Sequence, residues 1–137
     1  MKYILYLLVS LSFITSTHAQ VKRACDSVYH DVDSLASYPG GNEQLIKWMN
    51  TEMRDAFNEC NAHDSTEITS LTINLIIGSK GQVLDANFGD TEMAAGCRER
   101  MRKKLFAMKP WTPARKNGKA VCSYYSWLVG GVIWENQ

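Results

Sequence analysis

The chain begins with an apolar run that is too short to cross a bilayer. This run, Tyr3 to Ile14, has about 12 residues, whereas a membrane-spanning helix needs about 20. Lys2 precedes it, and the small and polar residues from Thr15 to Ala19 follow it. This order is typical of a secretory signal peptide. We therefore predict that residues 1–19 are a signal peptide whose cleavage leaves no stable membrane span, with a retained anchor as the less favoured alternative.

Histidine is scarce, with three residues in the chain, and no catalytic constellation is evident. The segment Tyr29–Asp33 carries imidazole and carboxylate groups, which can bind metals, but it lies in a polar stretch and is interpreted as a solvated loop. No Ser-His-Asp or Cys-His pair falls on adjoining predicted elements, and Gly78–Gly81 lacks the following helix of a phosphate-binding loop. We predict no catalytic residues, no metal site and no cofactor, and we do not expect an enzyme.

The chain has little net charge, but its charges are unevenly distributed. Residues 20–92 hold 5 basic and 12 acidic residues, whereas residues 93–137 hold 9 basic and 2 acidic residues. Attraction between the two halves of one fold would explain this pattern. The alternative is that the basic half, including Arg98, Arg102 and Lys103, meets an acidic partner or an anionic surface. Export makes nucleic acid an unsuitable partner.

The four cysteines include no Cys-x-x-Cys pair, which argues against a thioredoxin-like redox centre. An exported protein can form disulfides, and four cysteines allow three connectivities. Helical spacing places Cys60 and Cys97 on two apolar stripes that should pack on the same sheet. The stripes are Leu45, Met49, Met53, Ala56 and Cys60, and Met93, Cys97, Met101, Leu105 and Met108. We favour a Cys60–Cys97 disulfide, with buried free thiols as the alternative.

Periodicity predicts an α+β fold preceded by residues 20–37, a polar and flexible leader. The turn Tyr38–Asn42, with Asn42 as the cap, opens a helix that ends near Glu59. Strands follow over 68–78 and 82–88, with Leu84, Ala86 and Phe88 on one face; a helix over 92–107 and a strand over 120–129 complete the domain. The order predicts a two-layer sandwich, with two helices on one face of a three-stranded antiparallel sheet.

The bend before the last strand is the most specific motif. Met108-Lys109-Pro110-Trp111-Thr112-Pro113-Ala114 ends the basic helix and is followed by Asn117-Gly118-Lys119, a turn that leads into the strand. Together with the turn Tyr38-Pro39-Gly40-Gly41, this bend resembles the TonB C-terminal domain in the form common among Bacteroidota. The resemblance covers about residues 38–134, and we assign residues 38–137 to this domain.

The resemblance implies a periplasmic domain that adds a short extended peptide, the TonB box of an outer-membrane transporter, to its last strand. The implied partner-binding residues are consecutive: Ala120, Val121, Cys122, Ser123, Tyr124, Tyr125, Ser126, Trp127, Leu128 and Val129. A transporter or another envelope protein is the implied partner. The alternative is a structural envelope protein whose strand edge is protected or pairs with a second copy in a homodimer.

The sequence departs from the family at two points. An energy transducer keeps a membrane helix and a long proline-rich spacer, and about 18 residues without proline separate the predicted signal from Tyr38; fully extended, they span roughly 60 Å. The family's Tyr-Pro before the first strand is also missing, with Asn58-Glu59-Cys60 near its place. The resemblance therefore predicts a mode of recognition and leaves energy transduction in question.

Overall fold

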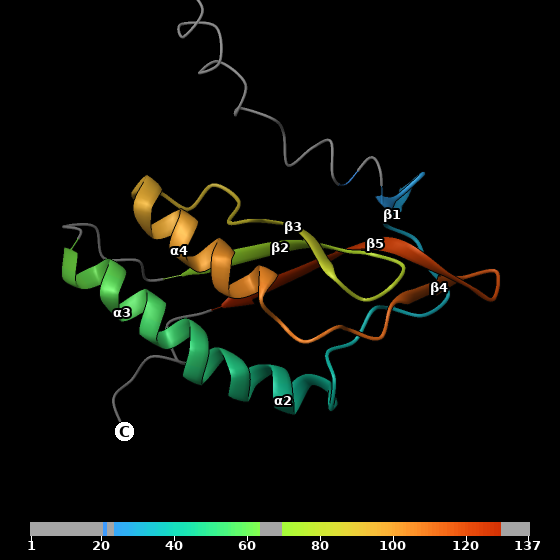
Figure 1. Cartoon of the computed structure of the whole chain (residues 1–137), viewed down its shortest axis with the longest axis horizontal. Helices are drawn as coiled ribbons and strands as arrows, with labels where there is room; N and C mark the ends of the chain where they lie inside the picture. Colours follow the sequence, from blue (N-terminus) through green and yellow to red (C-terminus); the bar gives the residue numbers. More distant parts are fainter. Residues whose placement is uncertain (1–20, 22–23, 64–69, 130–137) are drawn as a thin grey trace, which may run out of the picture.

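The computed structural model describes residues 21, 24–63 and 70–129, and it has a mixed α/β architecture (Figure 1). The predicted signal peptide, residues 1–19, lies outside this part. No helix within the described ranges is long and apolar enough to cross a membrane. The elements in chain order are β1 (Val28–Tyr29), α2 (Gly41–Trp48), the π-helical segment η1 (Met49–Met53), α3 (Arg54–His63), β2 (Leu71–Ile77), β3 (Val83–Asn87), α4 (Ala95–Phe106), β4 (Ala114–Lys116) and β5 (Lys119–Val129).

The α+β class is confirmed, but the sheet has five strands and not the predicted three. Its order is β1-β5-β2-β3, with β4 also paired to β5. The predicted part, β5-β2-β3, is antiparallel as expected, whereas β1 joins β5 in parallel. The two extra strands have only two and three residues. A period of two needs more residues than that to be visible in a sequence.

The β2–β3 hairpin contains a bulge that changes which residues face the core. Ile76 pairs with Asp85 and Ile77 pairs with Val83, so Leu84 is the extra residue. Val83 is buried beside Ala86, whereas Leu84 is only half-buried. The prediction that Leu84, Ala86 and Phe88 share one face is therefore wrong for Leu84, because simple alternation does not anticipate a bulge.

One nearly continuous helix, formed by α2, η1 and α3, provides the first predicted stripe. Its members Leu45, Met49, Met53, Ala56 and Cys60 are all buried. The helix begins at Gly41 and is preceded by Gly40 at φ +83°, a left-handed conformation that glycine adopts without strain. Asn42 lies inside the first turn, and no side chain caps the helix. The predicted Asn42 cap is therefore wrong, because the glycine turn makes the chain helical one residue earlier.

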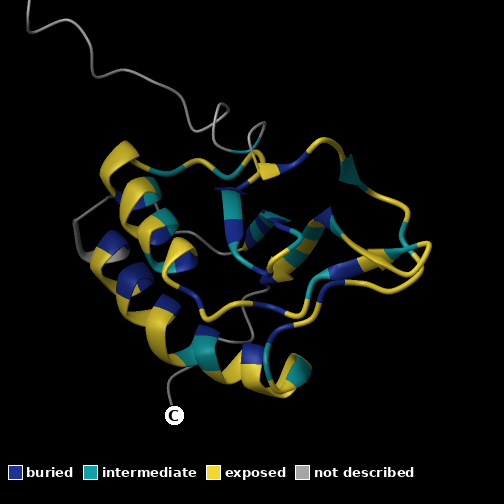
Figure 2. Cartoon of the chain, turned by 45° about the vertical axis from the view of Figure 1, so that its right-hand side comes forward, coloured by how far each residue is buried: buried dark blue, intermediate teal, exposed yellow. Residues whose placement is uncertain are grey.

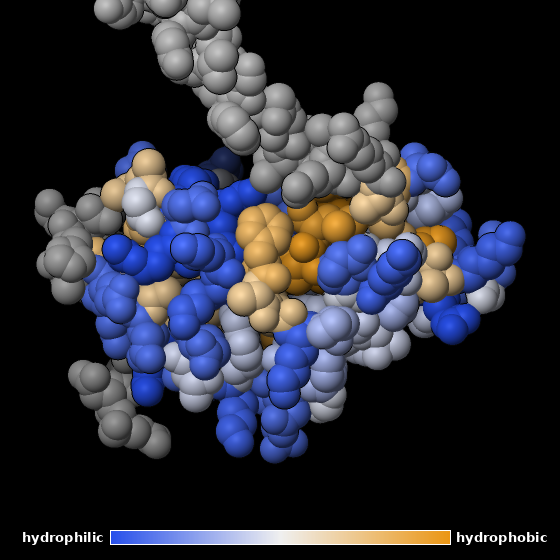
Figure 3. All heavy atoms as spheres, viewed as in Figure 1, coloured by the Kyte–Doolittle hydropathy of each residue, from blue (hydrophilic) through white to orange (hydrophobic). Residues whose placement is uncertain are grey.

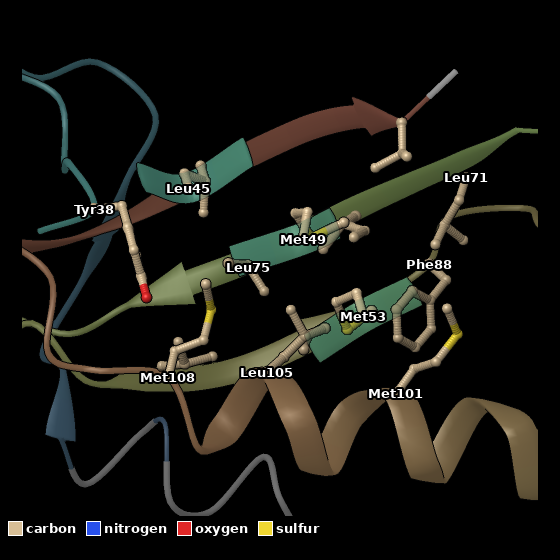
Figure 4. Close-up of a cluster of buried hydrophobic side chains, with 14 of the residues drawn as sticks. Tyr38, Leu45, Met49, Met53, Leu71, Leu75, Phe88, Met101, Leu105 and Met108 are labelled. Carbon is tan, nitrogen blue, oxygen red and sulfur yellow. The ribbon is translucent and has the colours of Figure 1, made fainter. Parts of the chain in front are cut away.

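The helix α4 provides the second stripe and closes the core from the same side of the sheet. Cys97, Met101 and Leu105 are buried, and Met108 is 9% exposed just beyond the helix. Figure 4 shows Met101 and Leu105 reaching from α4 into the cluster that contains Met53 and Phe88. The sides of the helices that face the strands are buried and the opposite sides are exposed, as Figure 2 shows. Cys60 and Cys97 form the disulfide that the two stripes favour.

The segment 24–37, here called the strap, is paired to the domain and is not the flexible leader that composition suggested. A second disulfide joins Cys25 to Cys122 of β5, and β1 of the strap pairs with Cys122 and Ser123. The strap then crosses to the far side of β4, where the backbones of Ser34 and Arg115 exchange hydrogen bonds. Polar composition indicated a solvated tether, but pairing to a strand and a disulfide do not require apolar residues.

The predicted bend is docked by Trp111, which is 3% exposed. Its ring meets Tyr38 and Tyr125 edge-on, with centroid distances of 5.5 and 4.8 Å. Its backbone N–H donates to the carbonyl of Gly81 at 2.7 Å. A β-carbon on Gly81 would lie 1.9 Å from the Trp111 carbonyl oxygen, so only glycine fits at this contact. The bend therefore joins the β2–β3 turn to the start of β5.

Candidate functional site

The predicted binding strand, residues 120–129, is β5, and its neighbours divide it into two parts. Along one edge, Ala120 and Val121 pair with β4, and residues 123–129 pair with β2. Along the other edge, which we call the outer edge, Cys122 and Ser123 pair with β1. From Tyr124 to Val129 the outer edge has no strand neighbour within the described part of the chain. The open part is thus about half of the predicted site.

The backbone geometry indicates which residues present hydrogen-bonding groups at the outer edge. The β4–β5 hairpin turns through Asn117 and Gly118, both at positive φ, and pairs Lys116 with Lys119. Such a two-residue hairpin closes with a hydrogen-bonded pair, and bonding direction alternates along the strand. The odd-numbered residues of β5 therefore point toward β4 and β2. The N–H and C=O groups of Ser126 and Leu128 point to the open outer edge.

Side chains alternate along β5 between the core and the face of the sheet away from the helices. Tyr125, Trp127 and Val129 pair with buried residues of β2 and pack on the core. Tyr124, Ser126 and Leu128 are exposed, and Leu128 is 68% exposed. An extended segment placed beside β5 would meet this row of alternate side chains in addition to free backbone groups.

His30 of the strap covers one of these exposed side chains. Its ring stacks on Tyr124 with centroids 3.9 Å apart and planes 10° apart. The histidine that composition assigned to a solvated loop thus marks the point where the strap ends along β5. No group of three or more histidine, cysteine or acidic side chains capable of holding a metal gathers within the described ranges.

The opposite edge of the sheet, along β3, is covered by an arginine from α4. Arg102 donates a hydrogen bond to the carbonyl of Ala86 and forms an ion pair with Asp85 at 3.4 Å. The side chains of Arg102 and Asp85 are only 19% and 23% exposed. A charged side chain placed over an edge is one of the ways in which sheets avoid pairing with other chains.

Among the described residues, four ion pairs connect the acidic and basic halves of the chain. They are Arg100–Glu59, Arg102–Asp85, Lys104–Glu52 and Lys116–Asp31. Each joins a carboxylate before residue 93 to a cation after it, and three of the cations lie on α4. This arrangement supports attraction between the two halves as the reason for the uneven charge distribution. The contact with Glu52 also raises the pKa of Lys104 above its usual value.

Two tyrosines, the buried Tyr38 and the half-buried Tyr125, line the inner side of the bend and keep their protons at neutral pH. Burial raises the pKa of Tyr125, and burial followed by the nearby charge of Glu52 raises the pKa of Tyr38. Both phenols therefore remain uncharged where they pack against Trp111. Through Trp111, these ring contacts connect the start of the long helix to Tyr125 of β5.

A groove of about 420 Å³ lies between the strap and the face of the sheet away from the helices. Val28, Ile76 and Tyr124 give it apolar walls, and Asn74, Asn87, Asp26 and Asp85 supply polar atoms. Figure 3 shows apolar surface over the strands between α4 and β1, with hydrophilic surface on either side. The groove reaches Tyr124 and so adjoins the outer edge.

Sequence reasoning located β5 but missed its neighbours. Ala120 and Val121 lie in the β4 hairpin, and Cys122 and Ser123 pair with β1. Tyr124 to Val129 have no strand partner on the outer edge among the residues that the structure describes. Cysteine counting could have indicated the strap, because a Cys60–Cys97 pair leaves Cys25 with Cys122 as its partner. No feature of the sequence indicated that Arg102 covers the edge along β3. Comparisons with family models, with curated proteins and with solved structures found no match for this chain.

Proposed function

We propose that this chain is an exported, non-catalytic binding module that adds an extended peptide to the outer edge of β5. The observation that supports this function best is the open edge from Tyr124 to Val129, where outward backbone groups of Ser126 and Leu128 have no strand partner in the described chain. In strand addition, such groups provide affinity and the alternate side chains provide selectivity. The peptide would lie beside Tyr124, Ser126 and Leu128.

The resemblance of residues 108–119 to the TonB C-terminal domain suggests the class of peptide. We propose the TonB box of an outer-membrane transporter as the ligand and the periplasm as the compartment. Two disulfides are compatible with an exported protein. A role in energy-dependent transport would be a further consequence of the same binding.

The decisive experiment compares two substitutions at one position. A fluorescently labelled TonB-box peptide is titrated into the exported chain, its Ser126→Pro variant and its Ser126→Ala variant, and fluorescence anisotropy is measured. Both variants lose the hydroxyl that hydrogen-bonds Asn74, but only proline removes the outward backbone donor. We expect wild type and Ser126→Ala to bind and Ser126→Pro to lose about tenfold or more in affinity, since a lost donor and a distorted edge each reduce strand pairing.

A negative result would be clear. If the wild-type chain shows no binding up to millimolar peptide, the TonB-box function is wrong. Equal binding by the proline and alanine variants would show that the peptide does not bind at this edge.

A self-associating envelope protein is the second candidate, and the same open edge supports it. Two copies can pair through their outer edges, because each presents free donors and acceptors and an exposed Leu128. Sedimentation velocity over a range of concentrations separates the candidates. Self-association predicts a concentration-dependent dimer that Ser126→Pro abolishes, whereas the binding module stays monomeric until peptide is added.

A further inference from the structure

The strap occupies the part of the outer edge that immediately precedes the open segment. Its two paired residues, Val28 and Tyr29, lie against Cys122 and Ser123. Alternation along β5 directs the backbone groups of Cys122 to the same outer edge as those of Ser126 and Leu128. The strap is therefore a strand added to β5 from within the chain, and it shortens the edge that remains open to another chain.

Side-chain packing holds the paired part of the strap only weakly. Asp26 and Ser27 are exposed, and Val28 and Tyr29 are half-buried. Two hollows of about 190 and 420 Å³ border the strap from Ala24 to Tyr29. A two-residue strand without a packed core contributes little stability by itself. Beside it, His30 stacks on Tyr124 and Lys116 lies 5.1 Å from the centre of the Tyr29 ring. The Cys25–Cys122 disulfide is the covalent attachment of this part of the strap.

The two disulfides of the chain differ in their surroundings. Cys60 and Cys97 belong to the hydrophobic core cluster, between the long helix and α4. Cys25 and Cys122 lie outside that cluster and line the hollow of about 190 Å³. All four cysteines are buried, but Cys25 is the most exposed of them at 8%. A small thiol reagent in this hollow can therefore approach the bond from the Cys25 side, whereas it must disturb the core to reach Cys60–Cys97. The bond that holds the strap is thus the one more open to exchange.

We propose that the Cys25–Cys122 disulfide controls the length of the binding edge, an inference that rests on the proposed strand-addition function. A dithiol reductant supplies the two electrons. One of its thiolates attacks a sulfur of the disulfide and forms a mixed disulfide, releasing the other cysteine as a thiolate that takes a proton. The second thiol of the reductant then displaces the remaining cysteine, which leaves Cys25 and Cys122 as thiols and the reductant as a disulfide.

Reduction frees β1 to leave β5, and the interaction surface then extends from Cys122 to Val129. A peptide paired to this longer edge gains the positions that Val28 and Tyr29 hold in the oxidised chain. Because each added backbone hydrogen bond contributes modestly, we expect the affinity of an extended peptide to rise by about three- to tenfold. The oxidised chain is the short-edge form and the reduced chain is the long-edge form.

The test uses the full exported chain, the variant Cys25→Ser/Cys122→Ser and the matched control Cys60→Ser/Cys97→Ser. Residue-resolved hydrogen exchange of β5 amides is measured by NMR, and anisotropy reports binding of the labelled TonB-box peptide. In a parallel pair the bonds slant, so Tyr29, the partner of Ser123, faces the outward backbone groups of Cys122 and of Tyr124, the first residue of the open segment. We therefore expect the amide protons of Cys122 or its serine replacement and of Tyr124 to exchange about tenfold or more faster in the first variant. The control removes the core disulfide and should leave these two amides protected relative to their neighbours.

Loss of a disulfide can unfold a small domain, so a second variant keeps the bond. Tyr29→Pro removes a backbone donor from β1 while the Cys25–Cys122 link stays in place. It should also accelerate exchange at Cys122 and Tyr124, and far-UV circular dichroism checks that the fold persists. Treatment of the wild-type chain with dithiothreitol should reproduce the exchange pattern, and reoxidation should reverse it.

The exchange and binding measurements can contradict the strap inference and the proposed function separately. Unchanged exchange at Cys122 and Tyr124 in the variants and in the reduced chain overturns the strap inference, even if peptide binds. Faster exchange without peptide binding in either redox state retains the strap as a releasable strand but rejects TonB-box recognition. Faster exchange with equal affinity in both states shows that the peptide does not use the released positions, which also overturns the proposal.

Discussion

The edge of the sheet along β3 and the outer edge of β5 are protected in different ways. Along β3, Arg102 bonds to the carbonyl of Ala86 and pairs with Asp85, so the edge is covered by one side chain that also supports the fold. Along β5, the strap covers Cys122 and Ser123 through a two-residue strand and a disulfide, and nothing within the described chain pairs with the edge beyond Tyr124. The β3 edge is thus covered by a side chain that also stabilises the fold. The β5 edge is covered by the strap, a segment that can separate from β5. Only the second arrangement suits binding.

Removing the Trp111 side chain, which packs against Tyr125 of β5, should have the largest effect on the free energy of unfolding. Trp111→Ala should lower the free energy of unfolding by about 3 to 5 kcal/mol, the usual range for deleting a large buried aromatic side chain. Trp111 packs edge-on against Tyr38 and Tyr125. Urea unfolding followed by circular dichroism gives the change. Trp111→Phe should cost less, because its ring still fills part of the site and the buried indole N–H has no hydrogen-bond partner among the described residues. Equal losses in the two variants would contradict the packing role of Trp111.

Opening the β3 edge should have an intermediate effect. Arg102→Ala leaves the Ala86 carbonyl and the mostly buried Asp85 carboxylate without this partner, which should destabilise the fold by about 1 to 3 kcal/mol. It should also cause concentration-dependent association, seen by sedimentation velocity. Arg100→Ala is the matched control, because its ion pair with Glu59 is 41% and 61% exposed and such pairs contribute about 0 to 1 kcal/mol. If both variants lose the same stability, Arg102 does not cover the edge in the way described.

The smallest effect on stability is expected at the open edge of β5. Leu128 is 68% exposed, so Leu128→Lys should change the free energy of unfolding by less than about 0.5 kcal/mol. The same variant should weaken TonB-box binding or self-association, because it places a charge in the exposed row of side chains. Thermal unfolding and peptide titration measure the two quantities separately. A large loss of stability would contradict the exposed position of Leu128.

Segments in which the hydrophobic period repeats over many residues could be predicted from the sequence. Short segments and irregular ones could not. The stripes through Met49 and Met101 and the alternation in β2 identified the two helices, the central hairpin and the last strand. The bulge at Leu84 and the three-residue β4 fall below the length at which a period shows. β1 has only two residues, Val28 and Tyr29, within a polar segment, and it is paired through its backbone and next to Cys25, so no period indicated it. The edge was therefore predicted as ten residues, and the structure leaves about half of it open.

The Cys25–Cys122 bond also has a mechanical consequence. The two residues are 97 positions apart in sequence, yet a pull on the chain upstream of Cys25 passes through one covalent bond directly to β5. If the opposing force acts on a peptide held along the same strand, the load runs from Cys25 through Cys122 and along β5. The helices and the β2–β3 hairpin lie outside that path and carry no direct tension. In the oxidised chain, such a pull would therefore shear the peptide away from β5 before it unravelled the domain.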